Sequence, residues 1–172
     1  FGKVYFPRLI VPLSIVVSNL IRFGIQLLLF FVMLAVYFFK GTPLHINAYI
    51  LLCPFLLLLM AMLGLGTGMI LSSLTTKYRD LTFLMAFGVQ LMMYLTTVIY
   101  PLSTVRSKYP AYAWLVEFNP MTTIIEIFRY AFLGRGTFSI LSLGITSALI
   151  ILILLLGLIT FNKVERNFID TV

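Results

Sequence analysis

Charged residues are scarce in this sequence, where Asp, Glu, Lys and Arg together make up 10% of 172 residues, against about a quarter in an average soluble domain. Hydrophobic residues account for 62%, and the mean hydropathy is +1.12. This composition indicates an integral membrane protein without a separate soluble domain. The net charge of +7 does not predict nucleic-acid binding, because the basic residues lie at the ends of apolar runs, at the level of lipid headgroups.

Residues that catalyse reactions or bind metals are also scarce. The single cysteine, Cys53, permits no disulfide within the chain and is interpreted as a small buried hydrophobe. The single histidine, His45, lies in a polar hairpin, so the sequence contains no cluster of metal ligands. Because neither an acid–base set nor a phosphate-binding P-loop is present, we expect no cofactor, no enzyme activity and no ATP hydrolysis in this chain.

Four apolar runs are long enough to cross a bilayer. They extend from about Leu9 to Phe39, Tyr49 to Leu74, Leu81 to Tyr100 and Phe138 to Phe161. All four are expected to be helices, because a helix satisfies its own backbone hydrogen bonds in lipid and these continuous runs do not alternate as barrel strands do. The sequence thus predicts an all-α, polytopic transmembrane helix bundle that forms a single domain over residues 1–172.

Short polar segments at Lys40–Ala48 and Thr75–Asp80 connect the first three runs, and a charged tail follows the last one. With four spans, both termini lie on the same side of the membrane. Six basic residues lie in short segments on that side, and five lie in a much greater length on the other side. The higher density predicts, by the positive-inside rule, that both termini are cytoplasmic.

The long connection Pro101–Thr137 is too apolar for a solvated loop and is interrupted by prolines. Within it, Asn119 followed by Pro120 is typical of a helix start, with a capping side chain and then proline at the first helical position. Gly134 and Gly136 indicate the helix end. The 15 residues from Pro120 to Gly134 correspond to a helix of about 22 Å, shorter than a hydrocarbon core of about 30 Å. The sequence therefore predicts a short interfacial or re-entrant helix on the outer side.

Glu126 and Arg129 lie three residues apart in this short helix, hence on one face, where they can form an ion pair. Two interpretations are open. In the first, the helix lies at the surface and its charges face water. In the second, the helix covers the outer mouth of a conduit, where a water-filled cavity tolerates the charges.

Two further sets of residues each share one side of a predicted helix: Ser14, Ser18, Arg22 and Gln26 in the first run, and Phe83, Phe87, Gln90, Tyr94 and Thr97 in the third. Each set is interpreted either as a seam packed against another helix or as the lining of a conduit. Arg22 can also extend to lipid phosphates. Gly64 and Gly68, four residues apart, predict close helix packing rather than a dinucleotide site, because no strand precedes them.

Five motifs occur in order along the chain: KVYFPRLIVPLS, TTKYRDLTFLMAF, VIYPLSTV, FNPMTTIIEIFRYAFLG and FNKVERNFIDTV. Together they resemble the permease subunit of ABC type-two transporters, and in particular the branch that exports polysaccharides such as O-antigen, capsule and teichoic acid. Family permeases have six spans after an N-terminal amphipathic helix, so this chain corresponds to the last four. Since it also begins with Phe1 and shows no signal peptide, we expect it to be the C-terminal part of a longer polypeptide.

The resemblance implies a homodimer of permeases in the lipid bilayer, working with cytoplasmic ATP-binding subunits that hold ATP and Mg. Two segments match the positions where the family couples to those subunits: Lys3, Tyr5, Phe6, Pro7 and Arg8, and then Tyr78, Arg79 and Asp80. The outer segment matches the re-entrant helices that gate the exit, at Tyr100, Pro101, Asn119, Pro120, Glu126 and Arg129.

The function implied by this resemblance is that of a permease subunit that moves a lipid-linked polysaccharide outward across the bacterial inner membrane. Two alternatives stay open. One is an ABC type-two exporter of a lipid or drug, which needs a side opening rather than a wide, wettable passage. The other is a structural or assembly membrane protein that transports nothing.

Overall fold

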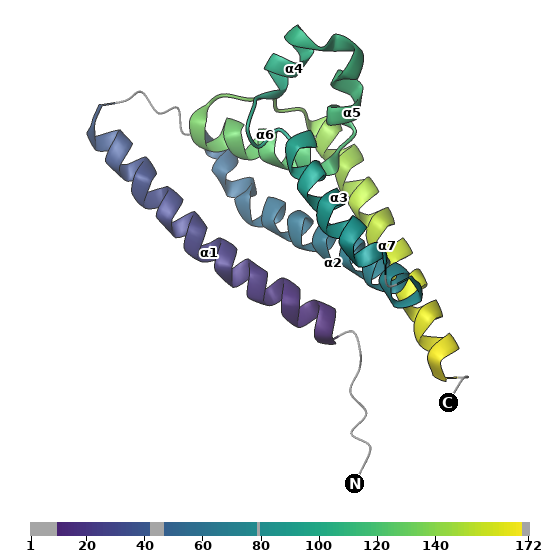
Figure 1. Ribbon diagram of the computed structural model, residues 1–172. Coiled ribbons are helices and arrows are strands. Elements are labelled where there is room, and N and C mark those ends of the chain that lie inside the picture. The colour runs from purple at the N-terminus through teal and green to yellow at the C-terminus, as the bar shows by residue number, and fades with distance from the viewer. Residues whose placement is uncertain (1–9, 42–46, 79, 170–172) are drawn as a thin grey trace. The chain divides into compact units, whose positions relative to one another are not determined.

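The computed structural model describes residues 10–41, 47–78 and 80–169, and every regular element in these ranges is a helix (Figure 1). The α-helices are α1 (Ile10–Phe39), α2 (Cys53–Lys77), α3 (Leu81–Leu95), α4 (Leu102–Lys108), α5 (Ala113–Glu117), α6 (Pro120–Leu133) and α7 (Ile140–Ile169). Short 3-10 turns, η1 (Ala48–Leu52) and η2 (Pro110–Tyr112), precede α2 and α5. The predicted all-α class is confirmed.

Three helical stretches of the described chain are long and apolar enough to cross a membrane: Ile10–Phe39, Ala48–Thr76 and Ile140–Val164. They correspond to the first, second and fourth predicted runs. The prediction for the third run is wrong at its end, because α3 has only 15 residues and a length of about 22 Å. The chain leaves the helix at Thr96, whose backbone is extended (φ −89°, ψ 146°), rather than continuing to Tyr100.

The chain divides into two compact units, residues 1–43 with α1 and residues 44–172 with α2 to α7, and each is described by itself. α1 is a 30-residue apolar helix in which no residue is buried. Its predicted polar side, with Ser18, Arg22 and Gln26, is exposed. An arginine within an apolar helix requires protein, water or headgroups beside it, and which of these Arg22 contacts stays a prediction, as does the single domain.

α2 and α7 cross at a point where their backbones touch. A Cβ atom placed on Gly66 of α2 would lie 2.8 Å from the Cα of Leu154, and one on Gly157 of α7 would lie 2.6 Å from the carbonyl oxygen of Gly66. Any side chain at either position would therefore push the helices apart, as at other small-residue helix crossings in membranes. The predicted packing at Gly64 and Gly68 is not what joins these helices, since no described atom lies within 4 Å of a Cβ placed on either.

α6 covers one end of the α2–α7 pair. Ile124 and Ile127 of α6 are buried against Leu56 and Leu59 of α2 and against Ile150 of α7. These contacts lie toward the start of both long helices, and the glycine crossing lies farther along both. α2 and α7 therefore run in the same direction, and α6 packs across the end at which both helices begin.

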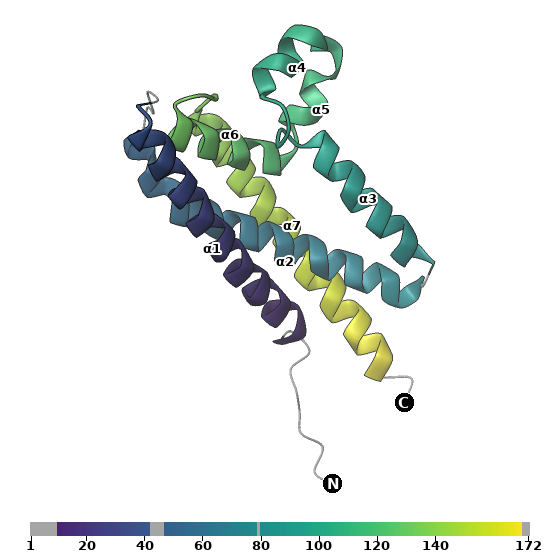
Figure 2. The same cartoon turned by 60° about the vertical axis from the view of Figure 1, so that its left-hand side comes forward.

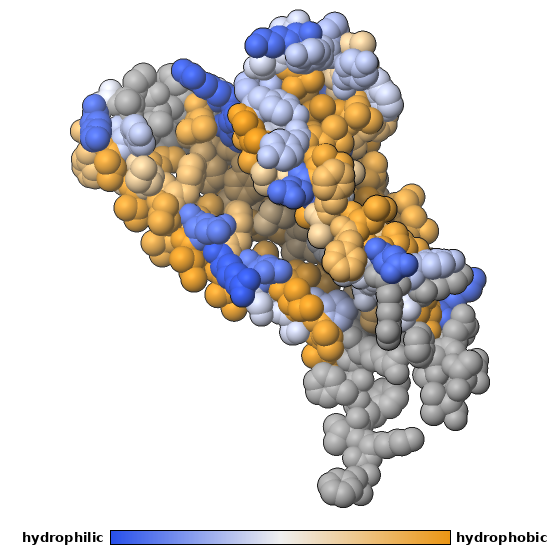
Figure 3. Space-filling model, in the orientation of Figure 1, coloured by the Kyte–Doolittle hydropathy of each residue, from blue (hydrophilic) through white to orange (hydrophobic). Residues whose placement is uncertain are grey.

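The two ends of this second unit differ in structure. α4, α5 and α6 lie at the end where α2 and α7 begin, and the α2–α3 connection and the end of α7 lie at the other (Figures 1 and 2). Figure 3 shows hydrophobic residues along the helices and hydrophilic ones over α4, where Arg106, Ser107 and Lys108 are exposed. The segment 101–137 thus lies opposite the turn Thr75–Asp80, as the sequence predicts, and the assignment of these ends to sides of the membrane stays a prediction.

Candidate functional site

The ends of α6 are formed by the residues that the sequence predicts. Asn119 is the N-cap, and its Oδ1 accepts a hydrogen bond of 3.0 Å from the backbone N–H of Met121. Pro120 occupies the first turn, where its missing N–H costs nothing. Gly134 ends the helix in the left-handed conformation (φ 64°), which favours glycine. Asn119 also contacts the C-cap residue of α3, because its Nδ2 donates to Thr96 Oγ1 at 3.3 Å.

Replacing Asn119 with alanine removes both contacts, and we expect the free energy of unfolding to fall by about 1 kcal/mol, as for other N-cap residues. Asn119→Asp keeps the capping oxygen and loses the donor to Thr96, so it should recover most of that loss. Unfolding in mixed detergent micelles measures both variants. Equal destabilisation by the two substitutions would contradict the capping role and assign the effect to the Thr96 contact.

Glu126 and Arg129 form the predicted ion pair, and they also bind the chain between α3 and α4. Glu126 Oε1 accepts from Arg129 Nη1 at 2.8 Å and from the backbone N–H of Leu102 at 3.1 Å. Arg129 Nη2 donates to the carbonyl oxygen of Thr97 at 2.9 Å and to that of Val98 at 3.4 Å. We call Glu126, Arg129 and these three backbone groups the latch. Because Glu126 is only 3% exposed, the interpretation in which both charges face water is wrong.

The latch provides hydrogen-bond partners for backbone groups that would otherwise lack one and would lower the stability of the protein. Leu102 is the first residue of α4, so its N–H has no acceptor within its own helix. The carboxylate of Glu126 supplies that acceptor, and its negative charge is favourable at a helix N-terminus. The carbonyls of Thr97 and Val98 follow the end of α3 and are bound by the guanidinium of Arg129. A buried ion pair with its hydrogen bonds completed in this way is tolerated in an apolar surrounding.

Residues 101–117, which we call the lid, form a helical hairpin with its own small core. Leu102 and Val105 of α4 are buried against Ala113 and Val116 of α5, separately from the core beneath α6. On the outside, Arg106 Nε donates to Glu117 Oε1 at 2.6 Å. The latch joins this hairpin to α6 through the bond from the Leu102 N–H to Glu126, and it holds the preceding residues Thr97 and Val98 through Arg129.

Gly136 lies so close to the latch that a side chain would not fit. Its φ is 142°, and a Cβ placed on it would lie 2.7 Å from the backbone oxygen of Glu126 and 3.3 Å from Glu126 Oε2. The sequence identified Gly136 only as part of a helix end. The structure adds that the chain entering α7 must pass directly over the buried carboxylate, which requires glycine.

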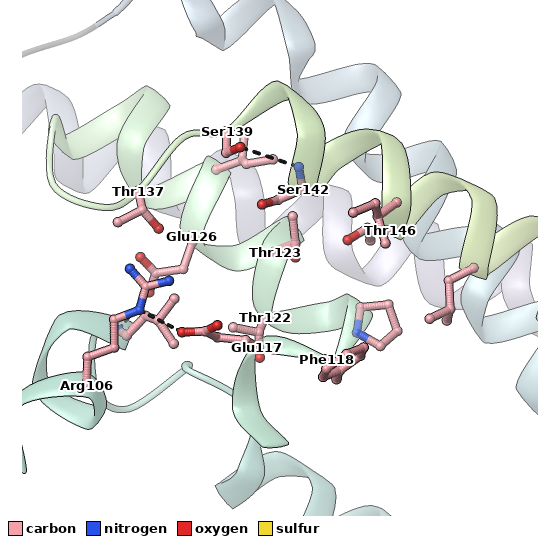
Figure 4. A pocket seen from close by; sticks show the side chains of 15 residues that line it. Arg106, Glu117, Phe118, Thr122, Thr123, Glu126, Thr137, Ser139, Ser142 and Thr146 are labelled. Carbon is pink, nitrogen blue, oxygen red and sulfur yellow. Dashed lines mark hydrogen bonds and ion pairs between the residues drawn. The ribbon is translucent and has the colours of Figure 1, made fainter. Parts of the chain in front are cut away.

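A cavity of about 420 Å³ lies between the lid, α6 and the first turns of α7 (Figure 4). Its lining includes the Arg106–Glu117 pair from the lid, Glu126 from α6 and a set of hydroxyl side chains. The hydroxyl residues are Thr122, Thr123, Thr137, Ser139, Ser142 and Thr146. These hydroxyl residues were not predicted as site residues, although Ser139, Ser142 and Thr146 recur at intervals of three and four, which places them on one helix face.

The predicted gate residues lie together at this end, and the predicted conduit face is only partly correct. Tyr100 donates to the carbonyl oxygen of Tyr94 at 2.6 Å, and Pro101 is the N-cap of α4. Phe87, Gln90 and Tyr94 are on α3 and exposed. Thr97, by contrast, lies beyond the end of α3 and is fully buried, so it does not share their face. What the remaining face contacts stays a prediction.

The predicted coupling residues lie at the opposite end or outside the described residues. Tyr78 is the C-cap residue of α2 and is exposed, and Asp80 precedes α3. Lys3, Tyr5, Phe6, Pro7, Arg8 and Arg79 fall outside the described residues. The coupling role of both segments therefore stays a prediction.

These features define a multi-pass helical membrane protein whose two ends have different structures. One end has a short helix across the long apolar helices, together with a lid and a buried ion pair. Residues 3–133 match the family model described as the ABC-2 type transporter. The chain therefore belongs to the ABC-2 type transporter family.

Curated relatives carry a more specific description. The chain is 26% identical over 168 residues to the O-antigen export system permease protein RfbA of Klebsiella pneumoniae, covering 98% of this chain and 62% of that protein. It is 29% identical over 130 residues to the protein of the same name from Myxococcus xanthus, covering 76% of this chain and 48% of that protein. The chain thus spans less than two thirds of the length of these relatives.

Proposed function

We propose that this chain is part of the membrane-spanning region of a permease subunit in an ATP-driven exporter, and that the exporter moves a lipid-linked polysaccharide out across a bacterial inner membrane. Membership of the ABC-2 family supports the transporter role, and the O-antigen export permeases among its relatives support the substrate class. The observation that carries the proposal is the latch, a buried ion pair that ties a self-packed lid to one end of a helical unit.

The proposed mechanism uses the two ends of the unit differently. A partner ATP-binding subunit holds ATP and Mg and contacts Lys3–Arg8 and Tyr78–Asp80 on the cytoplasmic side. Closure of that subunit moves the long helices, and the lid at the far end changes position relative to α6. Because a two-state change requires contacts that differ between the states, the latch is the contact that we expect to form in one state and break in the other. The polysaccharide passes between this chain and a second copy.

The proposal is tested with the full-length protein and its ATP-binding subunit in lipid nanodiscs. We expect lipid-linked polysaccharide to stimulate ATP hydrolysis and the same lipid without sugar to leave it at the basal rate. Tyr78→Ala should weaken association with the ATP-binding subunit by about tenfold or more, as expected for an exposed aromatic residue central to an interface.

Tyr112→Ala is the matched control, since Tyr112 is also an exposed tyrosine and lies in the lid at the opposite end. It should leave the association unchanged. If Tyr112→Ala weakened association with the ATP-binding subunit more than Tyr78→Ala, the lid end and not the Tyr78 end would face the cytoplasm. Stimulation by sugar-free lipid would instead favour a lipid exporter, and absence of a partner would remove the transporter proposal.

A further inference from the structure

Hydroxyl groups on the long helices usually bond to their own backbone. Serine and threonine in transmembrane helices commonly donate to the carbonyl three or four residues earlier, which removes the cost of placing a hydroxyl in an apolar environment. Ser73 of α2 donates in this way to the carbonyl of Met69, and Ser147 and Thr160 of α7 do the same, each at 2.8 Å. These hydroxyls have no capacity to donate to a ligand.

The hydroxyls that line the cavity behave differently. Thr122 Oγ1 is buried, with its residue 1% exposed, and has no hydrogen-bond partner among the described residues. Thr123 of α6 and Ser142 and Thr146 of α7 also make no side-chain hydrogen bond to a described group, and Figure 4 shows them around the same space. Of these three, Thr146 is buried, Thr123 is half-buried and Ser142 is exposed. A buried hydroxyl without a partner destabilises a protein. Among the described residues, Thr122 combines such a hydroxyl with a place in the lining of a cavity, whereas Thr97 Oγ1 is also unpartnered but does not line it. The position of Thr122 among further cavity hydroxyls favours a ligand as its partner.

The other groups around the cavity limit the chemistry of that ligand. Arg106 is paired with Glu117, and Glu126 is paired with Arg129, so each charge at the cavity already has a counter-charge. The described lining therefore offers no unpaired cation to a phosphate or carboxylate. It offers hydroxyl donors and acceptors, carboxylate oxygens and the apolar ring of Phe118, and this combination suits the hydroxyls and the apolar face of a neutral sugar.

We propose that this cavity is a saccharide-binding site, which holds a neutral sugar unit of the exported chain between the lid and α7. The volume of about 420 Å³ is within the range of about 300–1,000 Å³ for small-molecule sites, so it fits a short segment of sugar and not a folded polymer. The inference rests on the proposed export function and adds a specific contact to it. A sugar held here bonds to both α6 and α7 beside the latch, where it stabilises one position of the lid.

The site is tested by saturation-transfer NMR on the full-length protein with its ATP-binding subunit in nanodiscs. The probes are neutral trisaccharides of mannose, galactose and glucose. We expect transfer to at least one of them, and a two- to tenfold weaker affinity for each hydrogen bond removed, about the range for single hydrogen bonds. Ser142→Ala and Thr146→Val remove cavity hydroxyls, and Thr160→Val is the control, because it removes a hydroxyl that bonds to its own helix.

Thr122→Val distinguishes binding from a structural role. Valine keeps the shape and removes the unpartnered hydroxyl, so the variant should unfold at a higher temperature than the parent while its sugar affinity falls. A hydroxyl with a structural role would lower both. The inference is overturned by absence of transfer to all three sugars, or by equal affinities in Thr146→Val and Thr160→Val. In either case an intact association with the ATP-binding subunit and stimulation by lipid-linked polysaccharide would leave the export proposal standing.

Discussion

Replacing Glu126 with alanine is expected to lower the free energy of unfolding by about 3 kcal/mol, within the range found when one partner of a buried ion pair is removed. The substitution leaves the Arg129 guanidinium without its carboxylate and the Leu102 N–H without its acceptor. Arg129 keeps its bond to the Thr97 carbonyl, and its side chain is 19% exposed, so the cost lies toward the lower end of that range. Reversible unfolding in mixed detergent micelles measures the change.

Glu117→Ala is the matched control, since Glu117 also belongs to an arginine–glutamate pair at this end of the protein. The side chains of that pair, Arg106 and Glu117, are 55% and 37% exposed, and solvent screening limits an exposed pair to about 0–1 kcal/mol. Glu126→Gln keeps an oxygen for Leu102 and removes the charge, so it should fall between the two. Similar losses in Glu117→Ala and Glu126→Ala would show that burial of the latch contributes nothing.

The double variant Glu126→Leu, Arg129→Met measures the interaction energy between the two side chains, as distinct from the effect of removing either one. Each single substitution leaves a charge of the pair without its partner, whereas the double variant removes both charges and leaves only the Leu102 N–H and the carbonyls of Thr97 and Val98 without a side-chain partner. We therefore expect the double variant to lose less stability than the sum of the single losses, with a coupling of about 0.5–3 kcal/mol. Under the proposed function, it should also raise basal ATP hydrolysis, because the lid is no longer held to α6. Additive losses would contradict a direct interaction.

The ends of α6 and its ion pair could be predicted because their signals are local. Asn119, Pro120 and Gly134 each act on the one or two residues beside them, so the sequence order determines the helix start and end. Glu126 and Arg129 are three residues apart, and any helix brings them onto one face. The burial of the pair was not predictable, since it depends on Leu102, Thr97 and Val98, which lie more than twenty residues away in the chain.

The end of α3 could not be predicted from its own residues. The run stays apolar to Tyr100, and nothing in it marks a stop at Leu95. The residues that follow Leu95 are held by distant side chains, because Asn119 donates to the Thr96 hydroxyl and Arg129 donates to the carbonyls of Thr97 and Val98. Five residues of expected helix, Thr96 to Tyr100, are instead an irregular link of bends and turns that leads to the lid.

The packing glycines could be predicted only as a choice between two faces. Gly64 and Gly68 lie on one side of α2, and Gly66, two residues from each, lies about 160° away on the other side. The spacing of four favours the first pair. The face that meets α7 is decided by Gly157, which lies opposite Gly66, and a single sequence does not show which residues of two helices face each other.

Replacing Gly157 with alanine is expected to destabilise the protein by about 1–3 kcal/mol, the usual cost of inserting a methyl group into a packed contact. The added Cβ would lie 2.6 Å from the carbonyl oxygen and 3.1 Å from the Cα of Gly66. These are backbone atoms, so relief requires the helices to separate. Alanine favours the helix over glycine by about 1 kcal/mol. A net loss of stability therefore means that the damage to the α2–α7 contact is larger than this gain in helix propensity. Unfolding in mixed micelles measures the result.

Gly144→Ala is the control on the same helix, because a Cβ there meets no described atom within 4 Å, and it should be neutral or stabilising. Gly66→Ala should cost about as much as Gly157→Ala, since its Cβ would lie 2.8 Å from the Cα of Leu154. The double variant should cost less than the sum, because both substitutions open the same crossing and the second finds it already widened. A larger loss in Gly64→Ala than in Gly66→Ala would contradict the crossing, and would place the close contact of α2 on the face that the sequence favours.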